Sequence, residues 1–158
     1  MSSAPESVEA AAIVSQARGE SALWVQALRR PDEWEPVFSP LAPPQFGLGL
    51  ETVYEAYLVH YGRPRLFAPP DGDEAVLLGD YLYAHGLVRI AEAGGVDAVA
   101  AMAELISRCA ALRADGGNGD GEAWIDTARR LGGEPAADQV DAALARHCAR
   151  VAREVQAE

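Results

Sequence analysis

The sequence has no lysine: all 13 of its basic residues are arginines, set against 24 aspartates and glutamates. The arginines occur singly or in pairs, such as Arg29/Arg30 and Arg129/Arg130, and form no basic stripe. Proteins that hold the phosphate backbone of nucleic acid or an anionic membrane surface need such a stripe. With a formal net charge of −11, the chain is expected to bind neither.

Cysteine and long apolar runs are also scarce. Cys109 and Cys148 are the only two cysteines, and both lie in helix-like segments, so we expect buried thiols and no disulfide framework. No apolar run is long enough to cross a membrane. Residues 1–6 lack the basic start and apolar core of a signal peptide. These absences predict a cytoplasmic protein without a membrane span.

The common catalytic motifs are missing. There is no nucleophile elbow, no phosphate-binding Gly-Lys loop, no Cys-x-x-Cys and no His-Glu-x-x-His. His60, His85 and His147 do not have the spacing of metal ligands. The glycine-rich run 115–121 resembles a calcium loop only superficially, because its register places Gly116 and Thr127 at the first and last ligand positions. We therefore expect no metal or cofactor on this chain and no catalysis by the chain alone.

The composition favours helices. Alanine, leucine, glutamate and arginine are abundant, whereas aromatic residues make up 7% of a chain that is 49% hydrophobic. The 158 residues suffice for one domain with a core. The sequence therefore predicts an all-α protein, a single bundle of about six or seven helices.

Apolar residues recur every three or four positions in several segments, which predicts helices. Ser7 and Asp138 are candidate N-caps, and Gly19 is a candidate break in the first segment. Gly94-Gly95 is expected to end a helix. The predicted helical segments are 7–28, 45–61, 73–93, 96–114, 122–131 and 138–155.

Three boundaries follow from this pattern. Residues 1–114 are predicted to form the bundle core, with a connector over 31–44, where five prolines exclude a continuous helix. Residues 115–121 are predicted to be a glycine-rich linker, and residues 122–158 a C-terminal helix pair. Segment 73–93 is apolar on more than one face, so we expect it to be the central buried helix.

One stretch carries a more specific pattern. In residues 75–84, an apolar run leads into Gly79-Asp80, followed by Leu82 and Ala84, and Gly62 and Pro64 form a Gly-x-Pro upstream. This pattern resembles that of the trans-isoprenyl diphosphate synthases, all-α enzymes that elongate prenyl chains. A Gly-Asp-aromatic-Leu run of this kind is also compatible with simple helix packing, in which Gly79 allows close approach of a second helix.

The catalytic part of the family pattern is degenerate. The resemblance places Glu51-Thr-Val-Tyr-Glu55 at the first aspartate-rich motif, where only Glu51 and Glu55 keep a carboxylate. His60 and Tyr61 replace the family's paired arginines, and there is no second motif or any Asp-Asp dipeptide. Ionising an allylic diphosphate requires Mg²⁺ held by two facing carboxylate clusters. The resemblance therefore implies that Mg²⁺ is bound by a catalytic partner.

The family includes two-component medium-chain synthases, in which a short subunit without aspartate-rich motifs joins a catalytic subunit and helps set product length. The resemblance implies that this chain is such a small subunit of a heterodimer. The heterodimer would act in isoprenoid biosynthesis, in the synthesis of the quinone side chain. It also implies an interface on helices 73–93 and 45–61, and either a product-pocket or a core role for Phe46. The alternatives are an unrelated all-α binding or regulatory protein, a self-associating chain, and a relic of a synthase.

Overall fold

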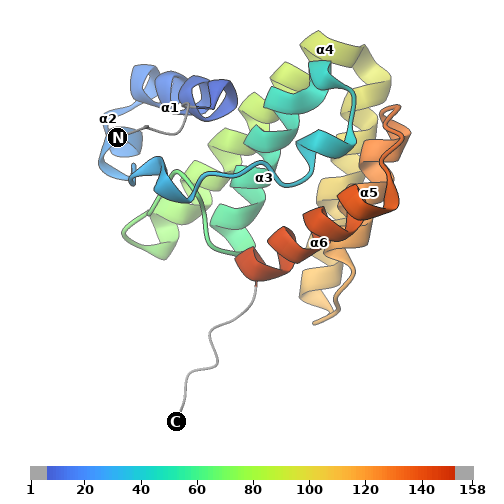
Figure 1. Cartoon of the computed structure of the whole chain (residues 1–158). Helices are drawn as coiled ribbons and strands as arrows, with labels where there is room; N and C mark the ends of the chain where they lie inside the picture. Colours follow the sequence, from blue (N-terminus) through green and yellow to red (C-terminus); the bar gives the residue numbers. More distant parts are fainter. Residues whose placement is uncertain (1–6, 152–158) are drawn as a thin grey trace, which may run out of the picture.

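The computed structural model describes residues 7–151 and is all-α, as predicted, with no strand in that range (Figure 1). Three short 3₁₀ helices lie between the second and third of six α-helices. The elements are α1 (Val8–Glu20), α2 (Ala22–Gln26), η1 (Pro31–Glu33), η2 (Ser39–Leu41), η3 (Pro44–Phe46), α3 (Gly47–Tyr61), α4 (Gly72–Ala114), α5 (Asp120–Arg130) and α6 (Ala137–Val151).

The central helix is α3, which is buried on every side from Gly49 to Leu58. The prediction that 73–93 is the central helix is therefore wrong. The buried residues of that segment form one stripe that includes Leu78, Leu82 and Ile90. Val76, Leu77 and Val88 are exposed, whereas Tyr83 and Leu87 are partly buried against the core. The all-round apolar composition of this segment therefore includes an exposed face.

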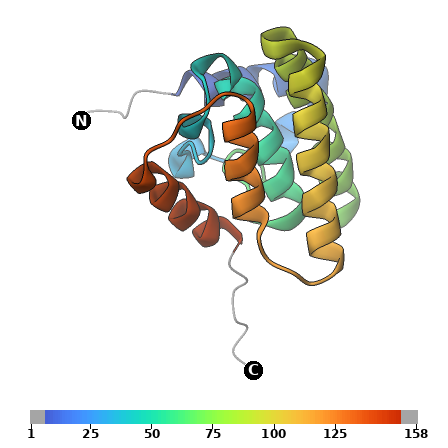
Figure 2. The same cartoon turned by 90° about the vertical axis from the view of Figure 1, so that its right-hand side faces the viewer.

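The long helix α4 consists of two antiparallel arms. Gly95 has φ 70° and ψ −158°, a left-handed-side conformation that glycine adopts without steric cost. Residues 72–94 therefore run one way and residues 96–114 run back beside them (Figure 2). A Cβ at Gly94 would lie 2.6 Å from the ring of Phe46. The predicted break at Gly94-Gly95 is confirmed.

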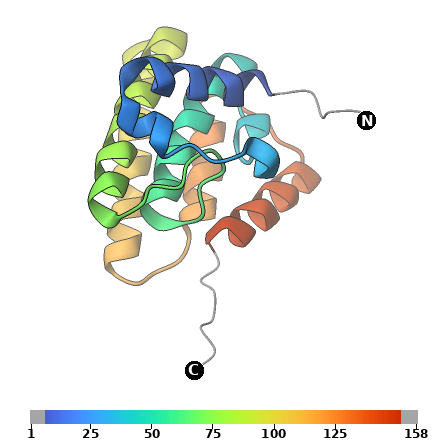
Figure 3. The same ribbon diagram turned by 90° about the vertical axis from the view of Figure 1, so that its left-hand side faces the viewer.

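The N-terminal helices follow the predicted pattern with one shift. Ser7 caps α1 by accepting a hydrogen bond from the Ala10 amide. The break falls at Ser21 rather than Gly19, because Ser21 is extended and its side chain caps α2. Separating α1 from α2 at this point lets both pack over α3 and the first arm of α4 (Figure 3).

The proline-rich segment 31–44, here called the strap, is an ordered connector. It crosses the front of α3 between the N-terminal helices and α6 (Figure 1). Phe38 is buried, and its ring stacks on Trp124 of α5 with centroids 5.4 Å apart. The strap is thus part of the core and covers one side of the central helix.

The C-terminal pair packs into the same core as α3 and α4. Trp124 and Ile125 of α5 and Ala143 of α6 belong to the main buried cluster. Helix α5 begins at Asp120, inside the predicted linker 115–121. The prediction of Asp138 as a cap is wrong, since α6 begins at Ala137 and the residue lies in its first turn. Residues 152–155 of the predicted helical segment 138–155 lie outside the described residues.

The two cysteines differ in environment. Cys109 is buried as expected, but Cys148 is exposed on α6, so its prediction as a buried thiol is wrong. The helical period placed Cys148 next to the apolar stripe, whereas His147 takes the inward position. Among the described residues, no helix has both the length and the apolarity that a membrane crossing requires.

Candidate functional site

Glu51 and Glu55 lie one turn apart on the same side of α3, and both are fully buried. Arg65, from the loop between α3 and α4, inserts between them and is itself fully buried. One terminal nitrogen of Arg65 lies 2.7 Å from Glu51 Oε2, and its Nε lies 3.0 Å from Glu55 Oε1. We call these three residues the Arg65 cluster.

Backbone amides donate hydrogen bonds to the two carboxylate oxygens that Arg65 does not contact most closely. The Val37 amide donates to Glu51 Oε1 at 2.9 Å, and the Leu66 amide donates to Glu55 Oε2 at 2.8 Å. All four carboxylate oxygens therefore accept hydrogen bonds from protein donors. Within the described residues, no group of three or more histidines, cysteines, aspartates and glutamates lies close enough to hold a metal ion.

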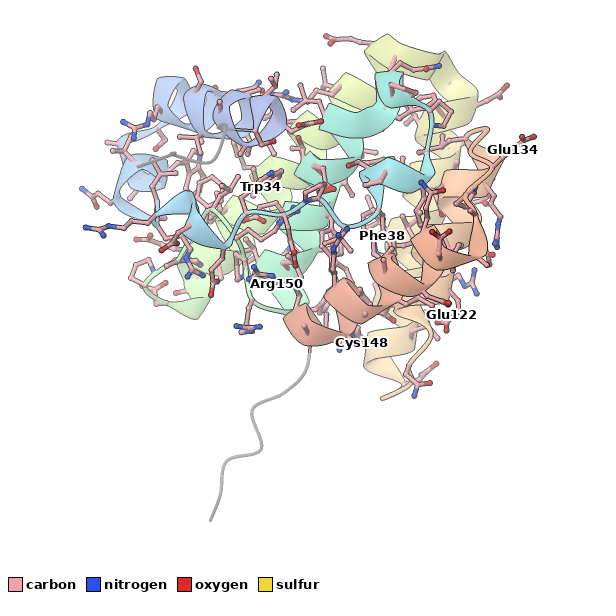
Figure 4. The ribbon with its side chains drawn as sticks, in the orientation of Figure 1. Trp34, Phe38, Glu122, Glu134, Cys148 and Arg150 are labelled. Atoms are coloured by element: carbon pink, nitrogen blue, oxygen red, sulfur yellow. The ribbon has the colours of Figure 1, made fainter. Side chains whose placement is uncertain are left out.

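The strap closes the cluster from outside. Arg65 donates to the Glu35 carbonyl at 2.8 Å, and its guanidinium lies over the Trp34 ring, 4.1 Å from the centroid. Figure 4 shows Trp34 on the strap in front of α3, with Arg150 of α6 near the strap's start. Arg150 donates to the Glu33 carbonyl at 2.7 Å. Backbone and side-chain contacts thus seal the carboxylates from solvent.

The charges of the cluster support one another. Burial by itself lowers the pKa of Arg65, but the two carboxylates beside it raise that pKa above its ordinary value. A Mg²⁺ ion would have to displace both the guanidinium and the backbone donors to reach Glu51 and Glu55. The carboxylate pair therefore does not fit an open magnesium site in this arrangement.

A second, partly buried polar cluster links α3 to the C-terminal half. The Tyr57 hydroxyl donates to Asp120, and Arg113 lies 2.8 Å from the same carboxylate. Arg113 also donates to the Tyr57 oxygen at 2.7 Å. Burial, with the Asp120 hydrogen bond, raises the pKa of Tyr57. Sequence analysis missed this cluster, because its members lie 56 and 63 residues from Tyr57.

His147 lies beside this cluster in the core. Its Nδ1 is 2.8 Å from the Tyr54 hydroxyl, and the residue is buried on the inner side of α6. Burial lowers the pKa of His147 to about 4. The unprotonated Nδ1 of the neutral imidazole can accept a hydrogen bond from the Tyr54 hydroxyl, whereas the protonated ring could not. His147 is therefore a core histidine, and in the part of the chain that the structure describes it belongs to no group of three or more side chains that could hold a metal ion.

The residues that match the family pattern divide between the inside and the surface. Gly79 and Leu82 are buried against α3 and the N-terminal helices, whereas Asp80 and Ala84 are exposed. The other three serve packing: a Cβ at Gly62 would lie 2.8 Å from the Arg150 carbonyl, the Pro64 carbonyl accepts from Arg29, and Phe46 is buried.

Phe46 also borders a surface hollow. The hollow has a volume of about 370 Å³ and lies where the turn of α4 meets the end of α5. Phe46 itself is only 5% exposed, and its ring packs on Gly94. This geometry favours the core role for Phe46 over direct contact with a growing chain.

Gly79→Ala is expected to lower the free energy of unfolding by about 1–3 kcal/mol, because the added methyl collides with the His60 ring. The matched control is Gly72→Ala, at a site with open space around it and no positive φ. The two variants are compared by urea unfolding at pH 7. Equal midpoints would show that the contact of α3 with α4 tolerates a larger residue at position 79.

The outer face of α4 is the other notable feature of the surface. Val76, Leu77 and Val88 on the first arm are 52%, 57% and 53% exposed, and Val96 at the turn is 84% exposed. These are four of the seven large exposed hydrophobic residues in the described chain. Small exposed residues also lie on the second arm: Ala100, Ala103, Ala110, Ala111 and Ala114.

The two arms form one side of the molecule, at the right in Figure 2 and at the left in Figure 3. The expectation that helix 45–61 contributes to an interface is wrong, since α3 is buried by the chain itself. The expectation for helix 73–93 stays a prediction, and only its outward residues can take part in it.

Comparison with known proteins gives no further guide to identity. No known family matches this chain, and neither the curated proteins nor the solved structures include a significant match.

Proposed function

We propose that this protein is the non-catalytic small subunit of a heterodimeric medium-chain trans-prenyl diphosphate synthase, helping to set product length in isoprenoid biosynthesis. The observation that carries the proposal is the Arg65 cluster. Glu51 and Glu55 stand where the family resemblance expects the first aspartate-rich motif, and Arg65 binds both carboxylates. Glu51 and Glu55 keep the spacing of the outer two carboxylates of that motif, but their carboxylate oxygens accept hydrogen bonds from groups of this chain.

The chemistry of prenyl transfer explains why such a chain needs a partner. Developing negative charge on the leaving diphosphate must be stabilised by metal ions and cationic side chains facing it. Here the nearest cation to the carboxylates, Arg65, is itself fully buried and satisfied. In the proposed complex, the partner supplies Mg²⁺ and all groups that contact the diphosphate.

The outer face of α4 supports a subunit role. Singly exposed apolar residues are common, but a contiguous exposed patch rimmed by polar residues is typical of an interaction site. Leu77, Ala84 and Val88 follow one another at helical spacing on the first arm, so their side chains lie on one face. We propose that this face binds the catalytic subunit and that product length is set by the shape the partner adopts in the complex.

The purified chain alone, given Mg²⁺ with allylic and homoallylic diphosphates, is expected to form no product above the no-protein blank. Mixed with the prenyl synthase encoded in the same genome, it is expected to form a complex and change the product length. Radiolabelled substrate with product chromatography measures both results. The Cys148→Ser variant, changed at an exposed position on α6, is the matched control and should behave like the wild type.

Product formation by the chain alone would contradict the non-catalytic role. A chain that neither binds nor alters any prenyl synthase of its genome would instead favour the unrelated all-α binding protein. Size-exclusion chromatography with light scattering separates these results, because it reports complex formation without relying on turnover.

A further inference from the structure

The exposed charged residues on the outer face of the first arm of α4 are carboxylates. Asp73, Asp80 and Glu92 are exposed on the first arm, and the Asp80 side chain is 70% exposed. Asp73 lies four residues before Leu77, and Asp80 lies three residues after it. All three side chains therefore share one face of the helix. Glu92 follows Val88 by four residues and lies at the edge of the same face.

Among the described residues no arginine forms an ion pair with Asp73 or Asp80, whereas Arg89 lies near enough to Glu92 to interact with its charge. Arg89, the only arginine of the first arm, donates to Gln16 of α1, while Arg108 and Arg113 of the second arm pair with Asp126 and Asp120.

His60 does not balance the charge of Asp80. It lies 3.6 Å from Asp80, but burial lowers its pKa, so the imidazole is neutral at pH 7. The face therefore presents apolar side chains with an acidic rim, in which Arg89 offsets part of the charge of Glu92 and no arginine pairs with Asp73 or Asp80.

We propose that this face binds a partner surface that is apolar at its centre and rimmed by lysine or arginine, and that it rejects a second copy of this chain. The proposal rests on the proposed function for the identity of the partner. In a symmetric dimer the same patch stands on both sides of the contact. Two copies would bring the carboxylates of one acidic rim to those of the other, and like charges at a contact oppose association.

With a basic partner, the same carboxylates would attract the lysine or arginine side chains that face them. Opposite charges at the rim of an interface steer the encounter and select the partner, while the apolar centre provides most of the affinity. The net charge of −11 on this chain acts in the same direction. The acidic rim is thus a device that prevents self-association of a face that must stay exposed until the partner binds.

The first test needs no partner. In the variant Asp73→Asn/Asp80→Asn/Glu92→Gln the rim is neutral, and its self-association constant is expected to be at least about tenfold higher than that of the wild type. The control Glu134→Gln/Asp138→Asn/Asp141→Asn removes the same charge at exposed positions near α6 and should stay monomeric. Sedimentation velocity over a concentration series measures both. A wild type that dimerises, or a neutral-rim variant as monomeric as the control, overturns the proposal.

The second test uses the purified prenyl synthase of the same genome as the probe. Its affinity for the wild type is expected to fall at least about tenfold between about 50 and about 300 mM NaCl, since rim charges are screened by salt. The neutral-rim variant should bind more weakly at low salt and show little salt dependence. If the synthase binds the wild type and the neutral-rim variant equally well, this inference is overturned and the proposed function stands. If the synthase binds neither the wild type nor the neutral-rim variant, the proposed function is overturned. The sedimentation experiment then still decides whether the face rejects a second copy of this chain.

Discussion

Arg65→Met is expected to lower the free energy of unfolding by about 3–5 kcal/mol, because it leaves two buried carboxylates without their cation. Glu51 and Glu55 have no access to solvent and receive Arg65 between them. Methionine fills much of the space of the arginine stem, so the loss of charge and hydrogen bonds dominates the change. Urea unfolding followed by circular dichroism at pH 7 measures the effect.

Three comparisons separate the cluster from general effects of substitution. Arg18→Met, at an exposed position in the last turn of α1, should change stability by less than about 0.5 kcal/mol. Arg65→Lys keeps the charge but loses the planar fork, so it should fall between the wild type and Arg65→Met. Adding Glu51→Gln to Arg65→Met should restore part of the loss, since one buried charge is removed. If Arg65→Met unfolds at the same urea concentration as Arg18→Met, the cluster does not stabilise the fold.

Acidification is expected to remove about 3 kcal/mol of stability through His147 alone. The pKa of His147 is lowered to about 4 in the folded chain by burial, against an ordinary value of 6.5. Between these two values the unfolded chain binds a proton at this position and the folded chain does not. Stability therefore rises with pH in this window, is fully present above about pH 6.5, and is lost by about pH 4.

The difference between the wild type and His147→Asn isolates this contribution, because other groups titrate equally in both proteins. Asparagine is neutral at every pH and its oxygen can accept from the Tyr54 hydroxyl, the partner of His147 at 2.8 Å. Urea unfolding at intervals from pH 7 to pH 4 gives the two curves. They should converge as the pH falls, and parallel curves would place the charged imidazole in the folded state without a penalty.

Local features of the fold could be predicted from the sequence because their causes are local. The cap at Ser7 depends on a side chain and an amide three residues apart. The break at Gly94-Gly95 depends on the conformational freedom of glycine. The separation of the strap from the helices depends on its prolines. Each of these needs only neighbouring residues, and each is present in the structure at or near the predicted position.

The choice of the central helix could not be made in this way. Segments 45–61 and 73–93 both carry apolar residues on several faces, and helical periodicity does not tell a face that meets the core from one that meets a partner. Packing decided it: α1, the strap, α5 and α6 surround α3 together with α4. Four large apolar residues of α4 were left at the surface as a consequence.

The sequence alone determined the all-α class, the helix start at Ser7, the break at Gly94-Gly95, and the positions of Glu51 and Glu55 one turn apart on one helix. Only the tertiary structure decided what those carboxylates meet. Arg65 lies 10 residues after Glu55 and 14 residues after Glu51 in the sequence. It reaches both carboxylates because the loop after α3 folds back along the helix and the strap covers the loop. The physical reason is that a buried charge needs its counter-charge nearby in space, and the folding of the loop and the strap over α3, which helical spacing does not specify, brings the two together.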